Sequence, residues 1–137
     1  MRRRILAAQR LDPTSFVLAF AFWAGIMGAS MVASEDVMAR TIIYQWLRDI
    51  PLSEDWWGAL MVADALALLW AADQPHPLRR AATCLVSGLF WFFWGGGQII
   101  GGLISGIVSS NGVWNMIAGI GLCVAGVQWI NRSGAPA

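Results

Sequence analysis

The chain has 137 residues, of which 58% are hydrophobic and 12% are charged. Soluble domains carry about 25% charged residues, so this composition excludes an ordinary soluble domain and, with nine tryptophans, indicates a membrane protein. The net charge of +1 and the absence of lysine also exclude a broad basic surface for nucleic acid.

Residues 1–15 form a basic leader, and Asp12, Thr14 or Ser15 is expected to cap the helix that follows. Residues 16–33 are an uncharged apolar run. As a helix this run is about 27 Å long, which is enough to cross the hydrocarbon core of a bilayer. We therefore predict a first membrane span at 16–33.

A cleavable signal peptide is the alternative interpretation of this region, because the chain starts basic and Val32-Ala33-Ser34 resembles a cleavage site. The apolar run is longer than the usual apolar region of about 7–15 residues in a signal peptide. Ala21, Gly25 and Ala29 also recur every fourth position, which favours packing against another helix. A retained span is thus the preferred interpretation.

Residues 36–50 have apolar side chains at helical spacing and polar ones on the other side. This pattern predicts an amphipathic helix that ends at Pro51 and lies on the membrane surface. It is interpreted either as a connector resting on lipid or as a lid or partner-docking helix.

Three further apolar segments predict spans at 56–72, 81–103 and 113–130. The far end of the third is ambiguous from sequence, since it either stops near Gln98 or continues to about Ile107. A helix to roughly residue 103, bent near its glycines, is favoured, followed by a tight turn over 109–112. The predicted fold is an all-α integral membrane protein, one domain over 1–137, with four transmembrane helices and the interfacial helix 36–50.

The arginines predict the orientation of these spans. Seven of the nine share one side of a four-span arrangement: Arg2, Arg3, Arg4, Arg10, Arg79, Arg80 and Arg132. Only Arg40 and Arg48 fall on the other side. By the positive-inside rule, both termini are expected in the cytoplasm and the protein in the bacterial cytoplasmic (inner) membrane.

Tryptophans near the ends of the spans are expected to anchor them at the two membrane interfaces. They are Trp56, Trp57, Trp70, Trp114 and Trp129.

Three polar side chains fall within or near the spans. Asp64 lies at the centre of the second span, where an ionised carboxylate costs at least about 2.5–3.5 kcal/mol. It is therefore expected to be a proton or cation site, or a protonated group hydrogen-bonded to Ser87, Gln98 or Asn115. Gln98 and Asn115 themselves are expected to hold helices together through amide hydrogen bonds.

Glycines in and after the third span repeat at spacings that suit close helix packing, within the chain or between chains. They are Gly88, Gly95, Gly97, Gly101, Gly102 and Gly106. A hinge or a flexible pore wall is the alternative. A dinucleotide-binding loop is excluded, because no strand–turn–helix unit surrounds the glycines.

The residue types of catalytic and metal sites are sparse in this chain. Cys84 and Cys123 lie in apolar segments without metal-ligand spacing, and they are expected at different depths, which argues against a disulfide. His76 stands alone in a loop. No nucleophile–base pair is apparent, so we predict no enzyme activity, no catalytic residues, no metal and no cofactor.

The chain resembles the small four-span membrane proteins of tailed phages and prophages, which are mostly uncharacterised and include holin-like proteins. The residues behind this resemblance are Leu11 to Phe16, Trp57-Gly58, Arg79-Arg80, Trp91-Phe92-Phe93 and Asn115. The resemblance implies a membrane-permeabilising, lysis-related role but identifies no functional residue.

Two functions from different classes are compatible with these observations. The first is a self-associating, holin-like protein whose small-residue faces form homo-oligomers in the bilayer. The second is a small subunit of a transporter or larger membrane complex, with Asp64 as a proton or cation site or as a buried polar contact.

Overall fold

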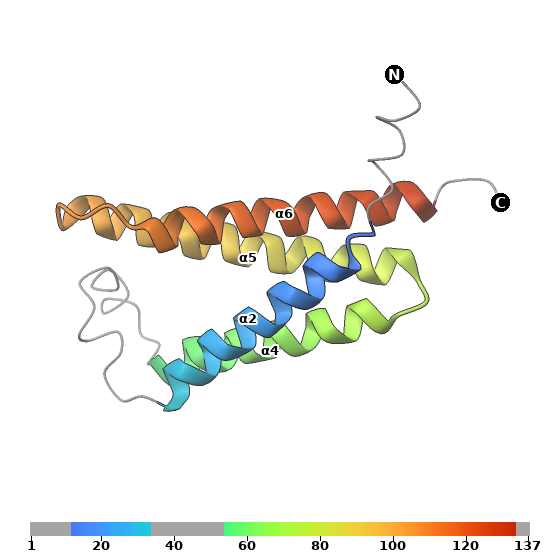
Figure 1. Ribbon diagram of the computed structural model, residues 1–137, viewed down its shortest axis with the longest axis horizontal. Helices are drawn as coiled ribbons and strands as arrows, with labels where there is room; N and C mark the ends of the chain where they lie inside the picture. Colours follow the sequence, from blue (N-terminus) through green and yellow to red (C-terminus); the bar gives the residue numbers. More distant parts are fainter. Residues whose placement is uncertain (1–11, 34–53, 134–137) are drawn as a thin grey trace, which may run out of the picture.

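The computed structural model describes residues 12–33 and 54–133, which form four α-helices (Figure 1). They are α2 (Thr14–Ala33), α4 (Glu54–Asp73), α5 (Pro77–Ile104) and α6 (Ser110–Ser133). All four are long and apolar enough to cross a membrane, and the described part of the chain contains no strand. The protein is thus a multi-pass helical membrane protein. The predicted helix 36–50 lies outside the described residues.

The four helices form two antiparallel pairs. α2 packs along α4, α5 packs along α6, and the two pairs meet mainly through α4 and α5 (Figure 1). The start of α2, the connector between α4 and α5 and the end of α6 lie at the same end of the molecule.

The distribution of side chains is that of a protein surrounded by lipid. Phe22, Val86 and Phe93 are each at least 70% exposed, whereas Ser87, Gln98 and Asn115 are buried. Between membrane helices there is no hydrophobic driving force, so close packing and hydrogen bonds hold them together. Large apolar side chains can then face outward.

Helix α5 runs without interruption through the three glycines at 95–97 and ends at Ile104. It begins at Pro77, four residues earlier than predicted, since proline is well suited to the first helical position. The chain leaves the helix through Gly106, whose φ of 72° lies in the left-handed region that favours glycine. Ser109 then caps α6 by accepting a hydrogen bond from the Gly112 amide at 3.0 Å, so the turn precedes 109–112.

Glycines bring α5 and α6 into backbone contact. A Cβ added at Gly88 would lie 2.7 Å from the Gly119 carbonyl oxygen, and one at Gly95 would lie 2.5 Å from that of Gly112. Gly102 meets the turn at the end of the hairpin in the same way. These three glycines, spaced seven residues apart, thus form one face of α5.

The α2–α4 pair also has a close backbone contact at a glycine. A Cβ at Gly28 would lie 2.6 Å from the Gly58 oxygen, so the backbones cross at this point. Ala21 is buried, but Ala29 is exposed. The small-residue face of α2 therefore includes Ala21 and Gly28 and turns away from Ala29.

Candidate functional site: a carboxylate between two helix pairs

Asp64 stands where the two helix pairs meet. Its Oδ2 accepts hydrogen bonds from Ser87 Oγ and from Trp91 Nε1, each at 2.8 Å. Asp64 belongs to α4, and both donors belong to α5. One carboxylate oxygen therefore links the α2–α4 pair to the α5–α6 pair.

Helix geometry explains why α5 supplies both donors. Residues four positions apart lie on the same face of a helix, one above the other. Ser87 and Trp91 have this spacing, and both are almost completely buried. They present a hydroxyl and an indole N–H to α4 at adjacent levels.

Aromatic packing fixes the Trp91 indole in place. Its ring lies 5.1 Å from that of Phe20, edge to face, and 5.1 Å from that of Trp23. Both neighbours come from α2. Such contacts add to the stability gained by burial, so α2 holds the ring that donates to the carboxylate of α4.

The electrostatic surroundings of Asp64 are poor in positive charge. Within residues 12–33 and 54–133, an ion pair joins Asp12 to Arg132. No basic side chain in these ranges forms an ion pair with Asp64. Both contacts of the carboxylate are to its Oδ2, and the side chain is only half-buried. Oδ1 takes part in neither of these hydrogen bonds.

The other predicted intramembrane polar residues pair with each other. Asn115 Nδ2 donates to Gln98 Oε1 at 2.7 Å across α5 and α6. Of the three side chains expected as partners of Asp64, Ser87 contacts it, and the two amides lie elsewhere. Asn115 Oδ1 is buried without a hydrogen-bond partner among the described residues.

The predicted interfacial tryptophans separate into two groups. Trp56, Trp70 and Trp114 are exposed. Trp57 instead packs against Trp94 of α5, with the ring centroids 5.1 Å apart and the planes tilted by 45°. Trp129 is buried, and the Arg80 guanidinium lies 5.5 Å from its ring.

The glycines that were predicted to lie at helix contacts differ in what they contact. Gly88, Gly95 and Gly102 contact α6 or the turn before it, and Gly101 is buried in α5. Gly97 is half-buried. Gly106 lies instead in the turn, with no atom within 4 Å of the place where a Cβ would stand.

Sequence reasoning missed the partner face on α6. Gly112, Gly119 and Gly126 repeat every seven residues, as the glycines of α5 do. A search for this spacing in both segments would have identified the paired faces and their antiparallel order.

The two cysteines lie closer together in depth than their positions in the predicted spans imply. Cys123 Sγ lies against Gly88, so that a Cβ there would be 2.6 Å away, and Gly88 is one helical turn from Cys84. The two helices extend further toward their shared end than predicted, to Pro77 and Ser133. Both thiols are nevertheless free.

Polar contacts join helices at the end of the molecule where α2 begins. Asp12 Oδ1 accepts from the Thr14 hydroxyl at 2.8 Å and from its amide at 3.2 Å, and lies 3.6 Å from Arg132 Nη1. The Thr14 hydrogen bonds and, more weakly, the Arg132 and Arg80 charges lower the pKa of Asp12. The start of α2 is thus tied to the end of α6.

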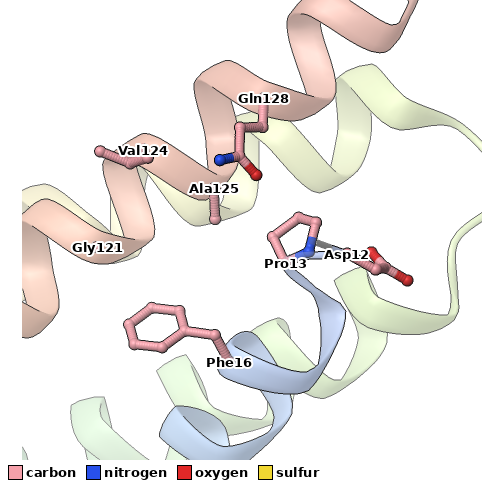
Figure 2. A pocket seen from close by; sticks show the side chains of 7 residues that line it. All are labelled: Asp12, Pro13, Phe16, Gly121, Val124, Ala125 and Gln128. Atoms are coloured by element: carbon pink, nitrogen blue, oxygen red, sulfur yellow. The ribbon is translucent and has the colours of Figure 1, made fainter. Parts of the chain in front are cut away.

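A cleft opens beside this contact, between α2 and α6 (Figure 2). Its walls are apolar, and Asp12 and Gln128 bring polar groups to it. His76 is exposed in the connector between α4 and α5. Among the described residues, no cluster of histidine, cysteine, aspartate and glutamate has the arrangement of a metal site.

Comparison of the chain with protein-family models, with curated proteins and with solved structures finds no match. The feature of the chain that bears most directly on function is the carboxylate between the helix pairs.

Proposed function

We propose that the chain is a non-enzymatic protein of the bacterial cytoplasmic membrane, with both termini in the cytoplasm, that acts as a small subunit of a transporter or membrane complex. Asp64 is its proton or cation site. One observation carries the proposal: a mid-span carboxylate bridges two helix pairs and lacks a basic partner among the described residues.

The two hydrogen bonds of Asp64 link its charge state to the packing of the helices. An indole N–H can only donate, and bonds to an ionised acceptor are about twice as strong as those between neutral groups. Protonation or cation binding at Asp64 therefore weakens its hold on Trp91. Binding of a proton or a cation at Asp64 therefore changes the free energy of association between the two helix pairs.

The first test measures proton flux. The full chain is reconstituted into liposomes that contain a pH-sensitive dye, and a pH gradient is imposed. Asp64→Asn should slow the flux at least about tenfold, because an amide does not titrate like the intramembrane carboxylates of proton pathways. Asp73→Asn, in an exposed aspartate at the end of the same helix, should leave it unchanged.

The second test applies even if flux requires partner subunits. Tryptophan fluorescence of the reconstituted chain should titrate with pH or with added Na⁺ or K⁺, and Trp91→Phe and Asp64→Asn should each remove this titration. The proposal is rejected if the wild type gives neither flux nor titration, or if Asp64→Asn behaves like the wild type. Size-exclusion profiles of all variants serve as the folding control.

The holin-like hypothesis has less support from the geometry. It depended on small-residue faces for association between chains, and Gly88, Gly95 and Gly28 now pack against partners within the same chain. Of the residues described, Gly96 is a half-buried helical glycine without a neighbour at its Cβ position. Open space at Gly96 does not by itself define an oligomer interface.

A further inference from the structure

The cleft between α2 and α6 has the shape of a site for an amphiphile. Its volume is about 210 Å³. Phe16 from α2 and Gly121, Val124 and Ala125 from α6 form its walls (Figure 2). These walls offer only carbon to a ligand, apart from the backbone.

The cleft reaches from the membrane interface into the hydrocarbon region. Gly121 and Gln128 are seven residues apart on α6, which corresponds to about 10 Å along the helix axis. Gln128 is near the end of α6, and Asp12 precedes α2. Phe16 and Val124 are both exposed on the outer surface, so the cleft is open to surrounding lipid.

Charges of both signs lie at the end of the cleft that Asp12 lines, where Arg132 pairs with Asp12 from outside the lining. Asp12 and Arg132 lie 3.6 Å apart, and their side chains are 63% and 42% exposed. The Gln128 amide, which reaches into the cleft in Figure 2, lies nearby. A headgroup at this end of the cleft would lie beside Asp12, which lines the cleft, and near Arg132, which pairs with Asp12.

We propose that this cleft binds one phospholipid with a zwitterionic headgroup, with its ammonium on Asp12, its phosphate on Arg132 and an acyl chain between Phe16 and Val124. An anionic headgroup without an ammonium would place a second negative charge beside Asp12 and offer that carboxylate no positive group in return. The proposal does not depend on the role of Asp64, because the two sites use different residues.

Lipid competition tests the headgroup preference. The full chain in mild detergent is incubated with equal amounts of dioleoyl phosphatidylethanolamine, phosphatidylcholine and phosphatidylglycerol, and native mass spectrometry counts the lipids retained. We expect each zwitterionic lipid to be retained about fivefold over phosphatidylglycerol, a ratio typical of one exposed charge contact. Asp12→Asn should reduce this ratio to about one, because asparagine keeps the helix cap but loses the charge. Asp73→Asn should keep it.

Filling the cleft tests the place of binding. A Cβ at Gly121 would lie 2.7 Å from the Phe16 ring, so Gly121→Leu should displace the ring into the cleft and reduce retention of all three lipids. Gly96→Leu, at a position with open space, should not. If Gly121→Leu does not fold, Val124→Trp blocks the same wall from an exposed position, with Ile117→Trp as its control.

Each result supports or overturns the proposal. Equal retention of the three lipids by the wild type, a preference for phosphatidylglycerol, or an unchanged preference in Asp12→Asn would overturn it. So would full retention by the folded variants that fill the cleft.

Discussion

Asp12 joins two helices from a position outside the hydrocarbon. It accepts both hydrogen bonds of Thr14 and pairs with Arg132. These contacts lower its pKa below the ordinary value of 3.8, and the Thr14 hydroxyl contributes most. The folded protein therefore binds a proton at Asp12 more weakly than the unfolded chain does.

This difference predicts how stability depends on pH. The stabilisation from Asp12 is complete above its ordinary pKa and is lost as the pH falls through the lower, folded value. The wild type should thus lose melting temperature in acid more steeply than Asp12→Asn, whose cap carries no charge at any pH. Thermal unfolding between about pH 2 and pH 6 measures this, and parallel curves for the two proteins would contradict it.

The sequence points to Asp64 but not to all of its partners. A carboxylate in the middle of an apolar span is conspicuous because of its cost, and Ser87 was among its expected partners. Trp91 was not, since tryptophans in such segments are expected mainly at interfaces. Its place beside Asp64 depends on how α4 crosses α5, which a single sequence does not specify.

At the scale of helices, the regular spacing of glycines determines which helices come into backbone contact. The seven-residue spacing in α5 was visible in the sequence, and the same spacing in α6 gives the partner. The connector between α4 and α5 is also short, yet these helices contact each other less than α5 and α6 do. Bulky side chains such as Trp94 stand between α4 and α5, whereas glycines let α5 and α6 approach to backbone contact.

This packing predicts opposite effects for two similar substitutions. A Cβ at Gly119 would lie 2.6 Å from the Gly88 oxygen and 2.6 Å from the Phe92 nitrogen, whereas one at Gly96 meets nothing within 4 Å. Gly119→Ala should destabilise the protein by about 1–3 kcal/mol, as overpacking does. Gly96→Ala should be neutral or stabilising by up to about 1 kcal/mol, because alanine is the better helix former.

Unfolding of the reconstituted protein in increasing SDS, followed by circular dichroism, compares these two variants with the wild type. A loss of stability in Gly96→Ala equal to that in Gly119→Ala would contradict the proposed packing, since it would indicate a general sensitivity of helix glycines. No loss in Gly119→Ala would indicate that α5 and α6 are further apart than the structure places them.

At the scale of the whole molecule, the contacts place the arginines of the described segments at one end. Arg132 pairs with Asp12 at the start of α2, and Arg80 lies 5.5 Å from the ring of Trp129. The segments that carry these arginines therefore gather at one end. The opposite end holds the α5–α6 turn, which contains no charged residue. By the positive-inside rule, we predict that this basic end faces the cytoplasm.

Labelling of single cysteines in intact cells tests this orientation. In a chain without Cys84 and Cys123, a cysteine at Val108, which is highly exposed in the α5–α6 turn, should react with an impermeant maleimide added outside the cytoplasmic membrane. A cysteine at His76, exposed in the α4–α5 connector, should react only after that membrane is permeabilised. The reverse pattern would show that the protein has the opposite orientation in the membrane. Labelling of both sites from outside would show that α5 does not cross the membrane. Asp64 lies in α4, and α5 carries both of its donors, Ser87 and Trp91. The crossing of α5 therefore brings these donors to the depth where a carboxylate needs partners.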